Sequence, residues 1–216
     1  MGARIEVTPQ ADERLWLQRA VLVLVSPGDV FAALRDDSDA VARAREEAVL
    51  AIVFIAGIAT VLWTPVAGRL LKDVTLDWLD VAVWAFLGGG LYGFVVYWLA
   101  GAVVHWVSRL GGGSGSYRRA RHLVAYAAAP LALSLFLVWP LRLAVYGEDV
   151  FREGGSDHGA GNWAFVFLEL ALAAWALGLL AFGLRIVQRW SWPRAVVVTA
   201  VSALVPVLLV LVGEVA

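Results

Sequence analysis

Residues 81–107 read VAVWAFLGGGLYGFVVYWLAGAVVHWV, and residues 108–121 continue as SRLGGGSGSYRRAR. The first stretch contains no Asp, Glu, Lys or Arg, and it is longer than the roughly 20 apolar residues that cross a bilayer core. The second stretch carries four arginines and no acidic residue. An apolar segment followed by a basic one predicts a membrane-spanning helix that ends in the cytoplasm.

Four more apolar stretches flank this one, at residues 46–67, 122–146, 162–187 and 195–213. The whole chain is 61% hydrophobic and 16% charged, whereas a soluble domain is about half apolar and a quarter charged. We therefore expect an all-α membrane protein with two parts, a cytosolic N-terminal arm over residues 1–45 and a five-span membrane domain over residues 46–216.

The charges between the spans predict the orientation. In chain order, the segments outside the five stretches carry 6, 2, 4, 1, 3 and 0 Lys or Arg residues, where Arg185, at the cytoplasmic end of the fourth stretch, is counted with the fifth segment. The first, third and fifth segments share one side of the membrane and hold 13 of the 17 basic residues. The positive-inside rule then places the N-terminus in the cytoplasm and the C-terminus outside. All but one of the basic residues are Arg, which is typical of a GC-rich bacterial genome, and in a bacterium the expected location of such a chain is the plasma (inner) membrane.

The arm contains one helix start. Ser26 is in the N-cap position, Pro27 is in the first turn and Asp29 is near the positive end of the helix dipole. The pattern predicts one moderately amphipathic helix over about 27–45. We expect residues 15–45 to lie on the cytoplasmic membrane surface. The alternative is a cytosolic helical hairpin that folds on itself.

Two features of the spans predict how they pack. Ala85, Gly89 and Gly93 recur every four residues, which lets another helix approach closely, although a backbone break lining a cavity would also use glycines. Small-residue faces on the second and fourth spans exceed what one bundle buries, so we expect a homo-oligomer. Pro130 and Pro140 each remove a backbone donor, so the third span should kink or unwind there.

Two charges lie inside predicted spans at similar depths. Arg142 is near the outer end of the third span, and Glu169 is about seven residues into the fourth span from the same side. Buried charges in a membrane are costly and normally find partners. We expect the two to pair, either as a structural clasp or as a functional site facing a cavity; the remaining alternative is no contact.

A basic cluster at the cytoplasmic surface is a candidate lipid site. The cluster contains Arg118, Arg119, Arg121 and His122. Each cation near an anionic leaflet contributes on the order of 1 kcal/mol of attraction. We expect anionic lipids of the cytoplasmic leaflet as partners, with topology determination alone as the equal alternative. The arm is a second candidate, for binding a partner protein.

Several kinds of chemistry are not indicated. The chain has no cysteine, and its net charge of −1 gives no attraction to nucleic acid. The glycine-rich run at residues 111–116 lacks the Gly-Lys-Ser/Thr of a nucleotide phosphate loop. The acidic residues of the loop at 147–161 match no calcium-loop spacing. We therefore predict no catalytic, metal or cofactor site.

Three short motifs occur in a characteristic order. They are Ser-Pro-x-x-x-Phe at 26–31, Gly-Gly-x-Gly-Ser-Tyr at 112–117 and Ala-Tyr-x-x-x-Pro at 125–130. Within a five-span frame, they resemble the Yip1 domain family. The resemblance implies a small polytopic membrane protein. Eukaryotic members act in vesicle traffic and bind Rab-type GTPases or one another, and bacterial members resemble plasma-membrane proteins. The resemblance implies no catalytic residue, because none is known for the family.

Three classes of function remain open. A non-enzymatic membrane protein that organises lipids or partner proteins agrees best with the resemblance and the arm. A transporter or channel for a small solute or lipid, formed within or between subunits, would use broken helices and intramembrane charges. An intramembrane enzyme is the weakest alternative, since no nucleophile, base and acid are found at one depth.

Overall fold

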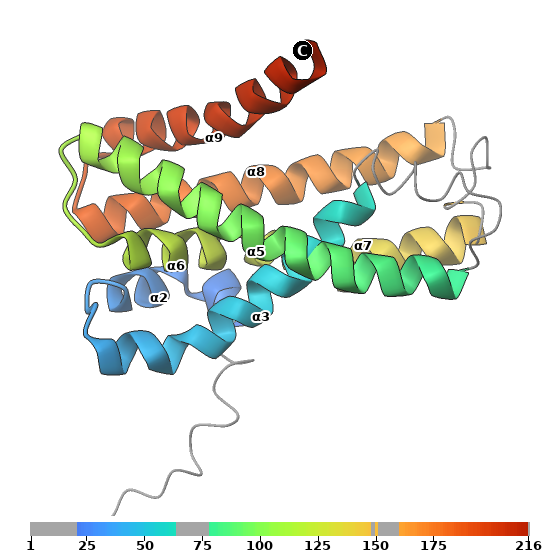
Figure 1. Cartoon of the computed structure of the whole chain (residues 1–216), viewed down its shortest axis with the longest axis horizontal. Coiled ribbons are helices and arrows are strands. Elements are labelled where there is room, and N and C mark those ends of the chain that lie inside the picture. Colours follow the sequence, from blue (N-terminus) through green and yellow to red (C-terminus); the bar gives the residue numbers. More distant parts are fainter. Residues whose placement is uncertain (1–20, 64–77, 148–149, 151–159, 216) are drawn as a thin grey trace, which may run out of the picture.

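The computed structural model describes residues 21–63, 78–147, 150 and 160–215, and within them it contains helices and no strand. Seven helices have defined bounds: α2 (Pro27–Ala33), α3 (Asp39–Trp63), α5 (Trp78–Leu110), α6 (Tyr117–Ala127), α7 (Ala129–Tyr146), α8 (Ala160–Gln188) and α9 (Trp192–Val215). Figure 1 shows α2, α6 and the C-terminal ends of α5 and α8 at one end of the bundle, called the arm end below. The opposite end, where α7 ends and α8 begins, is called the far end.

Four stretches of helix are long and apolar enough to cross a membrane. They are Asp39–Trp63, Ala82–Leu110, Tyr117–Tyr146 and Gly161–Gln188. They match the first four predicted spans, which confirms an all-helical architecture built for a membrane. The fifth predicted span lies in α9, whose side chains are described as far as Leu204. A fifth crossing therefore stays a prediction.

The single helix predicted over 27–45 is wrong, because the arm breaks after Ala33. Ser38 N donates to Asp36 Oδ1 at 3.0 Å, which is the local turn that Asp favours over helix. Arg45 then reaches back and donates to the carbonyl oxygens of Ala33, at 2.8 Å, and of Asp36, at 2.6 Å. These bonds satisfy carbonyls that the end of α2 leaves open. The first membrane helix consequently begins at Asp39, within the predicted arm.

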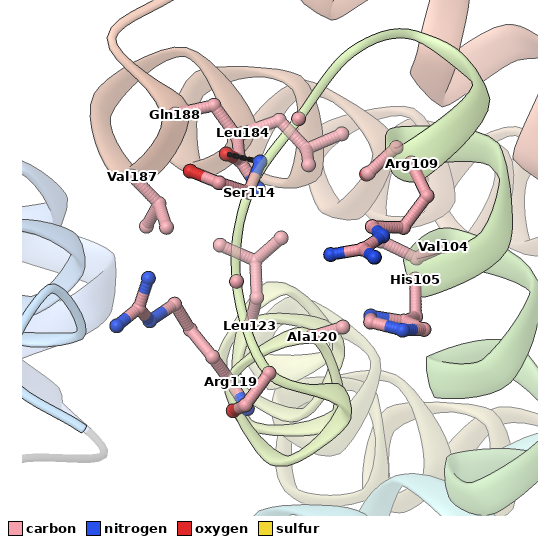
Figure 2. A pocket seen from close by; sticks show the side chains of 14 residues that line it. Val104, His105, Arg109, Ser114, Arg119, Ala120, Leu123, Leu184, Val187 and Gln188 are labelled. Atoms are coloured by element: carbon pink, nitrogen blue, oxygen red, sulfur yellow. Dashed lines mark hydrogen bonds between the residues drawn. The ribbon is translucent and has the colours of Figure 1, made fainter. Parts of the chain in front are cut away.

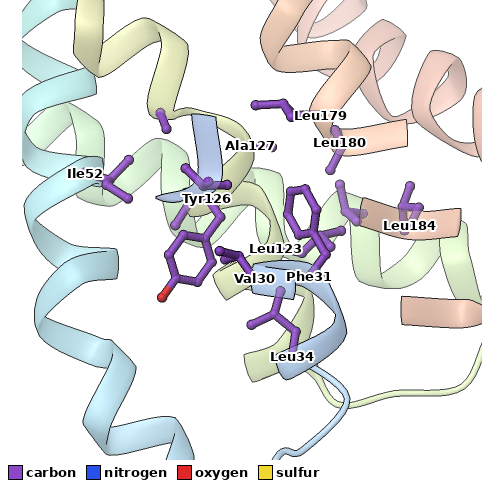
Figure 3. Close-up of a cluster of buried hydrophobic side chains, with 14 of the residues drawn as sticks. Val30, Phe31, Leu34, Ile52, Leu123, Tyr126, Ala127, Leu179, Leu180 and Leu184 are labelled. Carbon is purple, nitrogen blue, oxygen red and sulfur yellow. The ribbon is translucent and has the colours of Figure 1, made fainter. Parts of the chain in front are cut away.

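The apolar side of α2 is buried in protein. Val30, Phe31 and Leu34 are at most 8% exposed and belong to a core shared with α3, α6 and α8. Figure 3 shows Phe31 between Leu123 of α6 and Leu180 and Leu184 of α8. The apolar side of α2 thus packs against the bundle, and the location of residues 15–45 at the membrane surface stays a prediction.

The small-residue face of α5 packs against α3. A Cβ added to Gly89 would lie 2.6 Å from Ile58 Cα, and one added to Gly93 would meet the Val53 carbonyl oxygen. Gly57 of α3 approaches the same face, where its own Cβ would meet the Gly89 carbonyl. Glycine is required here because the two backbones touch. This face is therefore used within one chain.

The third predicted span consists of two helices. α6 ends at Ala127 and α7 begins at Ala129, with Pro130 in the first turn of α7, where a missing N–H costs little. Ala128 N still donates to the Val124 and Ala125 carbonyls at the junction. Pro140 lies inside α7.

Candidate functional site

The polar contacts at the arm end hold the arm to α6. Arg118 Nε is 3.1 Å from Asp37 Oδ1, and its Nη1 is 2.7 Å from Asp39 Oδ1. Its Nη2 donates to the Asp37 carbonyl, and the Ser116 hydroxyl donates to Asp37 Oδ2. Ser116 is also the N-cap of α6 and accepts from Arg119 N at 3.0 Å. We call Asp37, Asp39, Ser116 and Arg118 the arm lock.

Asp37 is the central carboxylate of the lock. Its side chain is 13% exposed, whereas that of Asp39 is 74% exposed. Burial alone would raise the pKa of Asp37, but the hydrogen bonds from Ser116 and Arg118 and the charge of Arg118 outweigh it, so the net pKa is lowered. Asp37 is therefore held as an anion by α6.

Two further arginines extend the contact across the arm. Arg119 Nη2 donates to the Arg35 carbonyl at 2.9 Å, and Arg35 Nη2 donates to the Ile186 carbonyl of α8 at 2.8 Å. The arm is thus joined to both α6 and α8 by charged donors on main-chain oxygens. Such bonds are among the stronger ones in proteins.

The predicted lipid cluster has partners inside the chain. Arg118 belongs to the arm lock, and Arg119 bonds to the arm. Arg121 lies over the Trp98 ring at 3.8 Å and near the Tyr117 ring at 5.0 Å. His122 is 2% exposed, so its ring does not reach the surface. Lipid binding by these four residues stays a prediction. In the structure their side chains contact other parts of the chain or are buried.

A pocket of about 20 Å³ lies beside the glycine-rich loop (Figure 2). It lies between the end of α5, residues 113–116, the start of α6 and the end of α8, and its lining includes His105, Ser108, Arg109, Arg119 and Gln188. Ser114 N donates to Gln188 Oε1 at 3.0 Å, and Gly113 N donates to the Ser108 carbonyl at 2.7 Å. These two bonds fix the loop over the pocket.

At the far end, Arg142 packs against two indole rings. Its guanidinium carbon lies 4.5 Å from the Trp63 ring centre and 5.3 Å from that of Trp139, and its Nη2 donates to Asn162 Oδ1 at 3.4 Å. Glu169 lies on the adjacent α8, where its Oε1 is buried without a hydrogen-bond partner. The expected pairing of Arg142 with Glu169 stays a proposal.

Most of the acidic loop lies outside the described residues, which include none of 148–149 and 151–159. In the part of the chain that the structure does describe, no three His, Asp or Glu side chains gather as a metal ion would require.

A family model for the Yip1 domain matches residues 21–213. The chain belongs to the Yip1 family. No curated protein and no solved structure matches it.

The residues that carry the Yip1 resemblance meet at the arm end. Phe31 is 0% exposed and Tyr126 is 1% exposed, and both lie in the core of Figure 3. Ser116 caps α6, and the Tyr117 hydroxyl donates to the Trp98 carbonyl at 2.7 Å. Ser116 thus belongs to both the motifs and the arm lock, while Phe31 and Tyr126 lie in the core that buries the apolar side of α2.

Sequence reasoning missed the partners of the basic cluster in this Yip1 protein. Asp37 and Asp39 lie on the same predicted side of the membrane as Arg118, so the opposite charges of the two segments were an available signal. Ser108 carried no signal, because a serine at a helix end is common. The burial of its hydroxyl depends on how the following loop folds back.

Proposed function

We propose that this Yip1 protein is a non-enzymatic scaffold of a bacterial plasma membrane, with its arm end in the cytoplasm, where it organises anionic lipids or a partner protein. The observation that carries the proposal is the arm lock. It holds the arm, the glycine-rich loop and α6 together as one fixed surface. A fixed surface costs less ordering entropy on binding than a loose arm does.

The far-end charges support the scaffold as well. Arg142 is enclosed by indole rings, and the neighbouring core contains Val138, Phe165 and Leu172, each at most 8% exposed. Cation–π contact of this kind stabilises a desolvated charge by about 2 kcal/mol. This arrangement favours a structural role for the intramembrane charge.

Native mass spectrometry of the protein released from membrane particles tests the proposal. Particles of mixed neutral and anionic phospholipid report the subunit count and the retained lipid together. The expected result is a homo-oligomer that retains anionic lipid in excess of its share of the particle. A lipid-free monomer that also recovers no protein partner through its arm would overturn the scaffold.

A transporter or channel remains the alternative, because one specific feature favours it. The third span is interrupted at Ala128, and Glu169 Oε1 is buried on the adjacent helix without a hydrogen-bond partner. Interrupted helices and buried carboxylates occur together in solute pathways. Flux assays in proteoliposomes separate the two functions. If the protein is a scaffold, the flux equals the background leak of protein-free vesicles. If it forms a pathway, the flux exceeds that leak and Glu169→Gln abolishes the excess.

A further inference from the structure

The pocket beside the glycine-rich loop has the charge of an anion site. Arg109 and Arg119 contribute two positive charges to its lining, and no Asp or Glu is among the lining residues. In Figure 2, Arg109 and His105 lie next to each other on one side of the pocket. Arg119 comes from α6, and its Nη2 donates to the Arg35 carbonyl. Its positive charge therefore lies on the opposite side of the loop from Arg109 (Figure 2).

A buried hydroxyl in the pocket lining lacks a partner. Ser108 is 5% exposed, lines the pocket and has no hydrogen-bond partner for its Oγ. A buried polar group without a partner destabilises the folded protein, so a group that enters the pocket and hydrogen-bonds to the Ser108 hydroxyl removes that penalty. A helical serine has a carbonyl four residues back to bond to, so an unused hydroxyl at this point is informative.

The size and position of the pocket limit what enters it. A volume of about 20 Å³ admits one oxygen-sized group, which matches a single oxygen of a larger anion. The 11-residue helix α6 begins beside the pocket at its N-cap Ser116, where the Asp37 carboxylate already accepts from the Ser116 hydroxyl and offsets the positive end of the helix dipole. Trp106 and Leu110 follow His105 and Arg109 in the sequence of α5. They are 70% and 85% exposed and offer an apolar surface.

We propose that this pocket binds a phosphate group, with Arg109 and His105 at its mouth and Ser108 in its buried part. The inference rests on the proposed lipid-organising function and names its ligand chemistry: a phosphate-bearing anion, either a lipid headgroup or free phosphate. The site differs from the nucleotide phosphate loop that the sequence excludes, since side chains of α5 rather than a Gly-Lys-Ser/Thr run hold the anion. It borders the arm lock, because Ser116 belongs to both, but Arg118 of the lock is not among the lining residues and already binds Asp37 and Asp39.

The lipid experiment uses particles of phosphatidylcholine with phosphatidylglycerol, and native mass spectrometry measures the lipid that the protein retains. The variants are Ser108→Ala, Arg109→Gln and the matched control Arg43→Gln, which removes one exposed positive charge from α3. The expected result is at least fivefold lower retention of phosphatidylglycerol by Ser108→Ala and by Arg109→Gln, with retention by Arg43→Gln unchanged. Melting temperatures confirm that all the variants are folded, and Ser108→Ala is isosteric enough to keep the helix packed.

The phosphate experiment uses particles of phosphatidylcholine alone. Inorganic phosphate is titrated into them, and broadening of its 31P line measures binding. Saturable broadening that Ser108→Ala and Arg109→Gln abolish would assign the pocket to free phosphate. If wild type retains phosphatidylglycerol but both variants retain it equally, and inorganic phosphate does not bind, the pocket proposal is wrong while the lipid function stands. If wild type retains no anionic lipid and binds no phosphate, the pocket proposal and the lipid-organising role both fail.

Discussion

At the scale of single residues, the arm lock depends on one carboxylate more than on its neighbour. Asp37 and Asp39 both contact Arg118, but Asp37 is mostly buried and accepts from Ser116 as well, whereas Asp39 is largely exposed. Exposed ion pairs contribute little, while hydrogen bonds to a sheltered charge contribute more. The two positions therefore separate the effect of the lock from the effect of removing a negative charge.

The substitution Asp37→Asn should lower the free energy of unfolding by about 1–2 kcal/mol, since it weakens charge-assisted bonds to Arg118 and Ser116. Asp39→Asn should change it by less than about 0.5 kcal/mol. Thermal unfolding in mild detergent measures both, and hydrogen exchange of α2 should rise in Asp37→Asn alone. Equal effects of the two variants would show that the arm is not held by this lock.

The lock should also depend on pH. Because the pKa of Asp37 is lowered from its ordinary 3.8, its contribution is fully present above that value and is lost as the pH falls through the folded-state pKa. The difference in melting temperature between wild type and Asp37→Asn should therefore be constant from pH 7 to about pH 5 and shrink below about pH 4. A difference that shrinks near neutral pH would assign the effect to another group.

Arg142 allows a second comparison between residues. Its guanidinium lies against the Trp63 and Trp139 rings, so a double-mutant cycle of Arg142→Gln with Trp139→Phe should give a coupling free energy of about 1 kcal/mol. The cycle with Glu169→Gln tests the proposed clasp. A coupling to Glu169 larger than the coupling to Trp139 would show that the ion pair, and not the aromatic contact, holds Arg142.

At the scale of helices, the contact between α3 and α5 depends on glycine at particular positions. A Cβ at Gly89 would lie 2.6 Å from Ile58 Cα, whereas one at the neighbouring Gly88 meets nothing within 4 Å. Gly89→Ala should destabilise the protein by about 1–3 kcal/mol through overpacking. Gly88→Ala is the matched control and should be neutral or slightly stabilising. Melting curves of the two variants in one detergent measure the contrast, and equal curves would contradict the close packing.

Hydropathy predicted the membrane helices because each span must satisfy its backbone within itself and remain apolar over the bilayer thickness. The stretch 81–107 lies within α5, and 162–187 lies within α8. The structure of the arm was harder to predict, since Asp and Ser side chains bond to nearby main-chain groups and so compete with the hydrogen bonds of a helix. The turn at Asp36 and the reach of Arg45 back to Ala33 depend on the folded arm, and the hydrophobic pattern does not contain them.

At the scale of the whole molecule, the candidate site was less predictable than the fold. The Arg118–Asp37 contact joins residues 81 positions apart, and the loop at 113–114 bonds to Ser108 of α5 and to Gln188 of α8. Composition identified the residue types at the arm end but not their partners. The same basic residues could attract lipid or bind acidic residues of the arm, and only the docking of α2 decides between these uses.

The remaining question at this scale is whether α9 crosses the membrane. Its 24 residues span about 36 Å, enough for a hydrocarbon core of about 30 Å, and residues 195–213 contain no charged side chain. Since the chain has no cysteine, single reporters can be introduced cleanly as Ser114→Cys and Ala216→Cys. With five crossings, a membrane-impermeant maleimide should label Ala216→Cys in intact cells and Ser114→Cys only after permeabilisation. If both require permeabilisation, the protein has four crossings, and α9 stays on the side of the arm.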